Sequence, residues 1–310
     1  MFEQRRKILI TGSSGFIGRH LLNNLINEDF DIHCLIRKLD SDLINKKTVS
    51  VFYYDVDLKN KEKLNRIVKN ISPDYVVHLA GEKSRSNELK KINSILENNI
   101  SGTLNLFECL LGIENLKRVT VLGSIEEYGF TDTPFKENSF ENPVSMYGVS
   151  KLTVTKLSKI FYNEYQLPIT ILRPSLVYGP KQGTEMFISL MINTLSKQQS
   201  FAMTKGEQYR DFIFIDDLVE AIKKTILIDD LSGLVINIAS GKSFMLSEIA
   251  KKIALILNAE NLLQIGAIEY RKLEIMNYEV DICLAAKKLK WEPLISIDTG
   301  LALTIKSFHE

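Results

Sequence analysis

"TGSSGFIG" at residues 11–18 follows the apolar run Lys7–Ile10 and opens the amphipathic segment Gly15–Ile26. A strand, a glycine-rich turn and a helix in this order are typical of the phosphate-binding start of a dinucleotide fold. The first glycine permits a tight turn, the second lets backbone amides approach a pyrophosphate, and the third allows the helix to pack closely on the strand. A glycine triplet alone also fits an ordinary turn, so the neighbouring pattern gives it weight. We expect the cofactor to contact Gly12, Ser14, Gly15, Phe16, Ile17 and Gly18.

Short β-branched runs alternate with helical periodicity through the first half of the chain. Strands are predicted at Lys7–Ile10, Asp31–Ile36, Val49–Tyr54, Tyr75–Leu79, Val119–Gly123 and Ile169–Leu172. Helices are predicted at Gly15–Ile26, Glu62–Asn70, Ile92–Leu111 and Ser145–Tyr165. Such alternation implies crossover connections between parallel strands. The predicted fold class is therefore a Rossmann-type α/β fold, with a doubly wound parallel sheet and a smaller C-terminal lobe.

The pattern changes after Pro174, where polar, loop-rich sequence follows. We predict a dinucleotide-binding domain at residues 1–174, with a return segment at 212–240, and a discontinuous nucleotide-sugar-binding lobe at 175–211 and 241–310. A strand is predicted at Phe212–Ile215, and helices at Met186–Lys197, Leu218–Ile228 (with Asp216 as N-cap), Leu246–Leu257 and after Thr299. A ligand is expected in the crevice between the two parts, at the carboxyl ends of the strands.

The charge balance excludes several classes of partner. The 310 residues include 39 Lys and Arg against 38 Asp and Glu, so no overall field favours nucleic acid or an anionic membrane. The three cysteines and four histidines are scattered and lack the spacing of a metal site. No targeting segment and no apolar run long enough to cross a bilayer is evident. We expect a cytoplasmic protein with reduced thiols and no bound metal.

The end of the second predicted strand carries two cations, Arg37 and Lys38. NAD-binding sites of this fold usually place a carboxylate there, which accepts hydrogen bonds from the ribose hydroxyls. A guanidinium pairs instead with a 2′-phosphate, so the pattern favours NADP(H). A solvated charge at a strand end is the plainer alternative, and it leaves NAD(H) possible.

A Tyr-x-x-x-Lys pair, Tyr147 and Lys151, opens the predicted helix Ser145–Tyr165. Pairs with this spacing also occur by chance, so the interpretation depends on where this pair lies in the predicted fold. Residues at i and i+4 share a helix face, and Ser124 stands upstream at the carboxyl end of a predicted strand. Together they resemble the Ser–Tyr–Lys triad of the extended short-chain dehydrogenase/reductase family, in its sugar-nucleotide epimerase/dehydratase branch.

Further motifs extend this resemblance over nearly the whole chain, beginning with the GxxGxxG spacing of residues 12–18. The others are Asp57-Leu58, His78-Leu79-Ala80-Gly81, "NISGT" at 99–103, "RPSLVYGP" at 173–180, "RDFIFIDD" at 210–217 and "RKLE" at 271–274, followed by Asp281 and Trp291-Glu292-Pro293. The resemblance implies cofactor contacts at Asp57, Leu58, Leu79, Ala80, Gly81, Asn99, Tyr147, Lys151 and Pro174. It also implies that Arg210 and Arg271 bind the diphosphate of a substrate, although each alone would fit a structural ion pair.

The resemblance also implies a mechanism. A phenol has a pKa near 10, and an adjacent ammonium and a cationic nicotinamide stabilise its phenolate. Tyr147 would exchange a proton with a sugar oxygen while hydride moves between the nicotinamide and the sugar carbon. Ser124 would hydrogen-bond that oxygen, and Lys151 would also hold the nicotinamide ribose. Glu126 would contact substrate or take part in catalysis, or, more plainly, bond nearby backbone.

The residues after Ser124 bear on the reaction. In the family a 4,6-dehydratase carries Asp-Glu or Ser-Glu there, whereas Ile125 stands before Glu126 here, which weakens dehydration. Met146 and the loop Glu82-Lys83-Ser84-Arg85 also depart from the family pattern, which bears on sugar identity. Residues 204–212 and 274–276 look most like reductases of nucleotide-linked 4-keto-6-deoxyhexoses.

The leading hypothesis is therefore an NADPH-dependent 4-ketoreductase that serves surface-polysaccharide synthesis. The alternatives are an NAD-dependent C4-epimerase and, less favoured, a 4,6-dehydratase. A non-enzymatic dinucleotide sensor is disfavoured by the intact triad.

The resemblance further implies a homodimer that pairs the segments 92–111 and 145–165 across a two-fold axis. Large side chains on these segments are Leu104, Phe107, Leu111, Leu157, Ile160 and Phe161. The alternative is that they cover the sheet.

Overall fold

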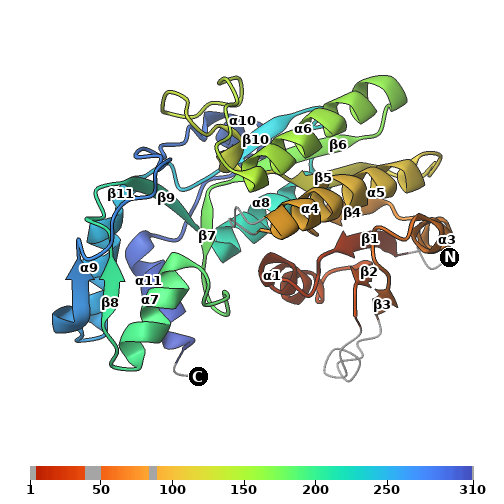
Figure 1. The fold of residues 1–310 in the computed structure, drawn as a ribbon. Helices are drawn as coiled ribbons and strands as arrows, with labels where there is room; N and C mark the ends of the chain where they lie inside the picture. Colours follow the sequence, from red (N-terminus) through yellow and green to blue (C-terminus); the bar gives the residue numbers. More distant parts are fainter. Residues whose placement is uncertain (1–4, 39–49, 84–88, 309–310) are drawn as a thin grey trace. The chain divides into compact units, whose positions relative to one another are not determined.

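The structure of the chain, a computed structural model, describes residues 5–38, 50–83 and 89–308. Val49, at the start of a predicted strand, and Ser84 and Arg85 lie outside the described residues. The chain divides into two compact units (Figure 1). The first consists of Met1–Gly129, Glu141–Arg173 and Val219–Ile236, and the second of Phe130–Phe140, Pro174–Leu218 and Asn237–Glu310.

A seven-stranded sheet organises the first unit. Its strands lie in the order β10-β6-β5-β4-β1-β2-β3. Their bounds are β1 Arg6–Thr11, β2 Phe30–Ile36, β3 Val51–Asp55, β4 Tyr75–His78, β5 Arg118–Leu122, β6 Ile169–Pro174 and β10 Val235–Ile238. The pairs from β3 through β6 are parallel, which confirms the predicted Rossmann-type sheet. The chain moves outward from β1 to β3 and then continues on the other side at β4, so the strand order reverses between β1 and β4.

The helices of this sheet are α1 Phe16–Leu25, α3 Lys61–Ile71, α4 Leu89–Leu96, α5 Gly102–Leu110, α6 Met146–Tyr165 and α8 Ile215–Leu227. Figure 1 shows α4, α5 and α6 together on one face of the sheet. Consecutive residues of β1, β4 and β5 are buried, so both faces of these strands are covered. Residues from α3, α5 and α6, such as Val68, Leu106 and Val154, pack with the strands in one hydrophobic core.

The predicted helix Ile92–Leu111 is interrupted in the structure. Between α4 and α5 lies a π-helical turn, Glu97–Ser101. The hydroxyl of Thr103 donates a hydrogen bond to the backbone carbonyl of Asn99 in this turn, at 2.5 Å. The spacing of hydrophobic residues does not reveal a single extra residue in one turn of a helix, so the π-turn was not predicted. Such π-turns often occur at functional sites.

In the second unit, the strand predicted at Phe212–Ile215 overlaps β9 (Tyr209–Phe214), whereas the short strands around it were not predicted from the sequence. A three-stranded sheet orders β11 (Ser243–Met245), β9 and β7 (Leu176–Tyr178), and a two-stranded sheet joins β12 (Leu263–Ile265) to β8 (Phe201–Met203). Its helices are α7 Phe187–Ser196, α9 Leu246–Ile256, α10 Cys283–Leu289 and α11 Ile297–Lys306. Strands of three residues are too short to show a two-residue alternation.

Several boundaries differ from those expected, and the return segment predicted at 212–240 is shorter, at Val219–Ile236. Residues 130–140 group with the second unit because Phe135 exchanges backbone hydrogen bonds with Glu279 and Asp281 there. The proposed N-cap Asp216 is wrong, since α8 begins at Ile215 and Asp216 lies in its first turn. A carboxylate in that turn still faces the positive end of the helix dipole.

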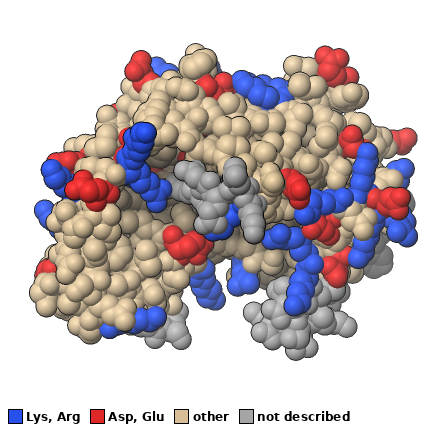
Figure 2. All heavy atoms as spheres, viewed as in Figure 1, with Lys and Arg blue, Asp and Glu red and all other residues tan. Residues whose placement is uncertain are grey.

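The surface of the described residues carries charges of both signs. Figure 2 shows Lys and Arg interspersed with Asp and Glu over the face that it draws. Within the described residues, no helix combines the length and apolar character needed to cross a membrane. In the same part of the chain, no group of three or more His, Cys, Asp or Glu residues could hold a metal ion.

Candidate active site

The turn after β1 depends on its glycines. Gly12 has a φ of +73°, and a Cβ on it would lie 2.7 Å from the backbone nitrogen of Ala80, which follows β4. A Cβ on Gly18 would lie 2.2 Å from the carbonyl oxygen of Gly12. Side chains at either position would therefore force apart the turn, α1 and the end of β4. The turn closes through a hydrogen bond from the Gly15 N–H to the Gly12 carbonyl, 3.0 Å long.

Helix α1 begins directly after this turn, at Phe16. Its N-cap, Gly15, has no side chain to satisfy the first N–H groups of the helix, and Ser14 is exposed. The N–H groups of Phe16 and Ile17 lie in the first turn, where the helix dipole is positive. This end suits the pyrophosphate of a dinucleotide.

A buried histidine connects the glycine turn to the π-turn. His78, the last residue of β4, contacts the hydroxyl of Thr11 through Nδ1 at 2.7 Å and the hydroxyl of Thr103 through Nε2 at 2.8 Å. Because the Thr103 hydroxyl donates to Asn99, it accepts from His78, which assigns the proton to Nε2. Burial, and then the charge of Lys151, lower the pKa of His78 to about 3, so the imidazole is neutral.

Asn99 lies at the centre of the π-turn and is buried. Its amide nitrogen donates to the hydroxyl of Ser150 at 2.9 Å and its amide oxygen accepts from the N–H of Glu82 at 2.6 Å. Ser150 in turn donates to the carbonyl of Tyr147 at 2.8 Å. Asn99 therefore joins the loop after β4 to the helix that carries Tyr147 and Lys151.

Lys151 is buried at the start of α6. Its Nζ donates to the carbonyl of Leu122 at the end of β5, at 2.7 Å, and lies 5.9 Å from the centroid of the Tyr147 ring. A Cβ on Gly81 would lie 3.5 Å from this Nζ. Burial lowers the pKa of Lys151 to about 8, and the charge of Glu127 opposes that shift. The structure thus brings together the predicted lysine and tyrosine with the glycine that follows β4.

Ser124 directly follows Gly123 at the end of β5 and begins the short 3-10 turn η2, Ile125–Glu127. Its Oγ accepts from the N–H of Glu126 at 3.2 Å, and its own N–H donates to Glu127 Oε1 at 2.8 Å. Glu126 is buried, and its carboxylate accepts from the Ser145 hydroxyl at 3.0 Å. Ser145 is the N-cap of α6, so the contact observed for Glu126 holds the start of the tyrosine helix.

Glu127 was missed in the sequence prediction. Ser124 and Glu127 form a capping box, in which each side chain accepts from backbone near the other residue. The Ser-x-x-Glu pattern at residues 124–127 is the sequence signal that could have identified this capping box. Glu127 is fully buried, which a capping box alone does not require.

The remaining predicted cofactor residues lie at the ends of strands. Arg37 and Lys38 are exposed just after β2. Asp57 accepts from the N–H of Lys59 at 2.9 Å, and Leu58 is buried. Three more sit at the ends of β4 and β6: Leu79, Ala80 and Pro174.

The two predicted diphosphate ligands belong to the second unit. Arg210 forms an ion pair with Glu274 and lies 4.6 Å from the ring centroid of Tyr278. Arg271 is exposed, and its carbonyl accepts from the Glu274 N–H at 3.2 Å. Both arginines are therefore connected to Glu274, one through its carboxylate and one through its backbone.

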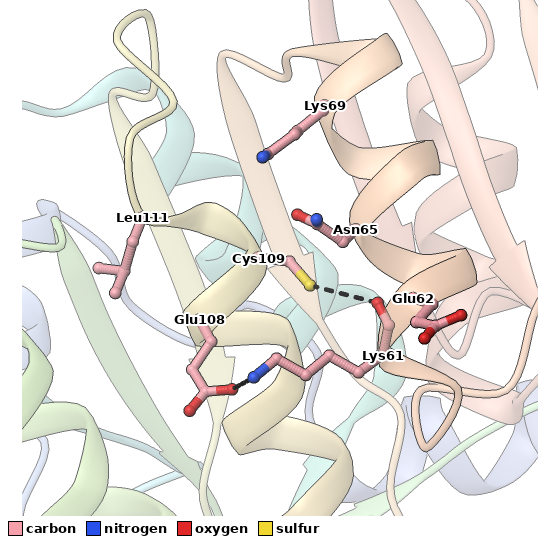
Figure 3. Close-up of a pocket in the computed structure, with 7 residues that line it drawn as sticks. All are labelled: Lys61, Glu62, Asn65, Lys69, Glu108, Cys109 and Leu111. Atoms are coloured by element: carbon pink, nitrogen blue, oxygen red, sulfur yellow. Dashed lines mark hydrogen bonds and ion pairs between the residues drawn. The ribbon is translucent and has the colours of Figure 1, made fainter.

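A hollow of about 400 Å³ lies between α3 and α5 and does not include the triad (Figure 3). Lys61 and Glu108 form an ion pair at its edge, and Cys109 Sγ points to the Lys61 carbonyl at 3.9 Å. Burial raises the pKa of Cys109, so the thiol is kept protonated and unreactive. The predicted triad lies elsewhere, with Ser124 and the Nζ of Lys151 near the carboxyl end of β5.

The sequence profile of the NAD dependent epimerase/dehydratase family matches residues 8–239 of this chain. The chain belongs to this family. A UDP-glucuronate 4-epimerase of Thermodesulfobacterium geofontis is 27% identical, over 96% of this chain and 94% of that protein. A dTDP-glucose 4,6-dehydratase of Neisseria gonorrhoeae is 27% identical, over 98% and 96%. The solved structure of a UDP-glucuronic acid 4-epimerase from Bacillus cereus, in complex with UDP-glucuronic acid and NAD, superposes with a TM-score of 0.90 at 25% identity, covering 98% of this chain and 99% of that one.

The site of this epimerase/dehydratase family member fits a nicotinamide dinucleotide. A Cβ on Gly12 or Gly18 would collide with neighbouring backbone, so the glycines permit the tight turn, and the first turn of α1 offers N–H groups. Gly81 lies beside the ammonium of Lys151. These features lie within the first unit, at the point where the strand order reverses.

Proposed function

We propose that this chain is a 4-epimerase of a UDP-linked sugar that works with a bound nicotinamide dinucleotide. The observation that carries the proposal is the buried Lys151, which lies beside Tyr147 and beside Gly81 after β4. Support comes also from 4-epimerase relatives that align over nearly the whole chain. These relatives favour the epimerase alternative over the reductase that led the sequence analysis.

In the proposed mechanism, Tyr147 takes the proton of the C4 hydroxyl and later returns it. The Ser124 hydroxyl, whose oxygen accepts from the Glu126 N–H, donates to the same sugar oxygen. Lys151 places its positive charge beside the phenol and holds the ribose of the cofactor. The bound nicotinamide supplies the hydride chemistry at C4. Delivery of hydride to the other face of the sugar would invert C4 with no net consumption of the cofactor.

We further propose that the two arginines of the second unit hold the substrate diphosphate. Arg210 is already paired with a carboxylate, that of Glu274, in the structure. A diphosphate offers the same kind of oxygen acceptors and would compete for this guanidinium. Arg271 is exposed in the same loop and can add a second cation.

Two residues disfavour 4,6-dehydration. The side chain at position 125 is a buried hydrocarbon, 1% exposed, which offers no proton. Loss of water across C5 and C6 needs both a base and an acid. The carboxylate of Glu126 is bonded to Ser145 and can serve as one of these at a time.

The 4-ketoreductase is the second candidate, and Arg37 is the observation that favours it. The guanidinium is exposed at the end of β2, where a 2′-phosphate of NADP(H) would be recognised. Net reduction commonly draws on NADPH. In this reading the sugar substrate arrives already oxidised at C4, and only hydride delivery and the Tyr147 proton are required.

Replacement of Tyr147 by Phe removes the transferable proton and keeps the ring. We expect kcat to fall by about 10² or more, with cofactor affinity near that of the wild type. Tyr165→Phe, at the exposed end of the same helix, is the matched control and should stay fully active. Retention of most activity by Tyr147→Phe would remove the tyrosine from the mechanism.

A substrate panel separates the three reactions. UDP-glucose, UDP-galactose, UDP-glucuronic acid and UDP-N-acetylglucosamine are each incubated with protein and NAD⁺, and products are followed by NMR. We expect at least one to yield its C4 epimer without accumulation of NADH.

A second arm supplies NADPH with nucleotide-linked 4-keto-6-deoxyhexoses. Oxidation of NADPH there, with no epimer in the first arm, would replace the proposal with the reductase. A 4-keto-6-deoxy product from dTDP-glucose, CDP-glucose or GDP-mannose would establish a dehydratase instead. Tyr147→Phe protein serves as the blank in each arm.

The contribution of Arg37 is tested through the dissociation constants of NADP⁺ and NAD⁺. Arg37→Asp should weaken NADP⁺ binding tenfold or more, because a carboxylate would repel the 2′-phosphate, and should change NAD⁺ binding much less. Arg66→Asp, exposed on α3, changes the net charge equally and should leave both constants unchanged. Equal constants for both cofactors in Arg37→Asp and wild type would exclude a role for this guanidinium.

We also propose a homodimer that pairs through α6. The structure narrows the predicted face, since Phe107 and Phe161 belong to the core of the first unit and cannot form it. Val149 and Ile160 are exposed on α6, eleven positions apart and on one side of the helix. Sedimentation equilibrium should give the mass of two chains at micromolar concentration, and Ile160→Glu should shift it toward one. A monomer in the wild type would refute the dimer.

A further inference from the structure

The carboxylate of Glu127 is fully buried and receives donors on both oxygens. Oε1 accepts from the Ser124 N–H at 2.8 Å. Oε2 accepts from the Thr155 hydroxyl and from Arg173 Nε, each at 2.8 Å. A buried carboxylate is tolerated when charge and hydrogen bonds compensate it, and here both are present.

Arg173 compensates that charge from β6. Its guanidinium is fully buried, with Nη2 2.7 Å from Glu127 Oε2 and 3.0 Å from Glu141 Oε1. Burial opposes the charged form, but Glu127, Tyr128 and Glu141 together raise the pKa of Arg173 above its usual value. The guanidinium therefore stays charged, and it holds the Glu127 carboxylate in one place.

The position of Ser124 depends on this carboxylate. The Ser124 backbone is extended, with φ −163° and ψ 147°, and its N–H points at Glu127. A Cβ on Gly123 would lie 2.5 Å from Glu127 Oε1, so a glycine precedes the serine where the carboxylate needs the space. The Oγ of Ser124 is thus presented from a backbone that Glu127 fixes.

The same carboxylate acts on Lys151 through space. Glu127 faces Lys151 from η2, His78 faces it from β4, and Tyr147 faces it from α6. His78 is neutral, so Glu127 is the negative charge among these groups. Its presence opposes the fall in the pKa of Lys151 that burial causes.

We propose that Glu127, held by Arg173, is a positioning residue that fixes the backbone of Ser124 for the reaction at C4. The inference rests on the proposed function for its catalytic consequence, whereas its structural consequence can be measured on the free protein. Glu127 touches neither sugar nor cofactor in this role. It acts through Ser124 and through its charge on Lys151.

Glu127→Gln keeps an oxygen acceptor and removes the charge. We expect kcat to fall about tenfold or more with KM changed less than twofold, because the serine is displaced while the binding groups remain. Loss of the anion lowers the pKa of Lys151 below about 8, so the alkaline limb of the kcat/KM profile should move to lower pH.

Glu141→Gln is the matched control. Glu141 forms ion pairs with the same guanidinium, at 3.0 Å, and with Lys156, at 2.9 Å. Its contact with Arg173 is separate from the contact between Glu127 and Ser124. It should leave kcat and the alkaline limb at wild-type values. Equal losses in Glu127→Gln and Glu141→Gln would overturn the proposal, because the effect would then belong to Arg173 or to general stability.

The double variant Glu127→Gln/Arg173→Gln serves if the single variant does not fold. Removal of both buried charges avoids an uncompensated one, so this protein is expected to fold. Amide exchange at Ser124, read by NMR, should be tenfold or more faster than in the wild type. Unchanged exchange at Ser124 would overturn the positioning role. Absence of epimerase activity in the wild type would refute the proposed function and leave this exchange test standing.

Discussion

The ammonium of Lys151 is buried at the carboxyl end of β5, where it donates to the carbonyl of Leu122. A charge in this position costs several kcal/mol unless polar groups and an opposite charge compensate it. The surrounding structure supplies both: the carbonyl of Leu122 at the strand end and the carboxylate of Glu127. The site is arranged around this buried cation, and the charge that it carries is what makes a phenol beside it useful as an acid–base group.

A second network fixes the geometry around the cation. His78 connects Thr11, at the start of the glycine turn, to Thr103, which satisfies the carbonyl of Asn99. Asn99 bonds Ser150 on the helix that carries Tyr147 and Lys151. The turn that suits a dinucleotide and the helix that carries the proposed acid–base group are therefore joined by side-chain hydrogen bonds.

Sequence reasoning succeeded where a local pattern determines the structure. The strand–turn–helix at the N-terminus, the alternation that predicts parallel strands, and the i, i+4 pair of Tyr147 and Lys151 are all short-range signals. It failed for the π-turn and the Glu127–Arg173 pair, because their cause lies in contacts between residues far apart in the chain. Glu127 and Arg173 are separated by 46 positions. For the same reason the sequence did not show that Phe107 and Phe161, both named for the predicted dimer face, belong to the hydrophobic core of the first unit.

The most direct test of the account follows the hydrogen at C4. A UDP-sugar that the enzyme accepts is labelled with deuterium at C4 and converted in ordinary water, and its product is examined by NMR and mass spectrometry. The account predicts that the C4 epimer keeps the deuterium, because the hydrogen leaves and returns as hydride within the site while Tyr147 exchanges only the hydroxyl proton with its surroundings. Replacement of the deuterium by solvent hydrogen during turnover would contradict the account.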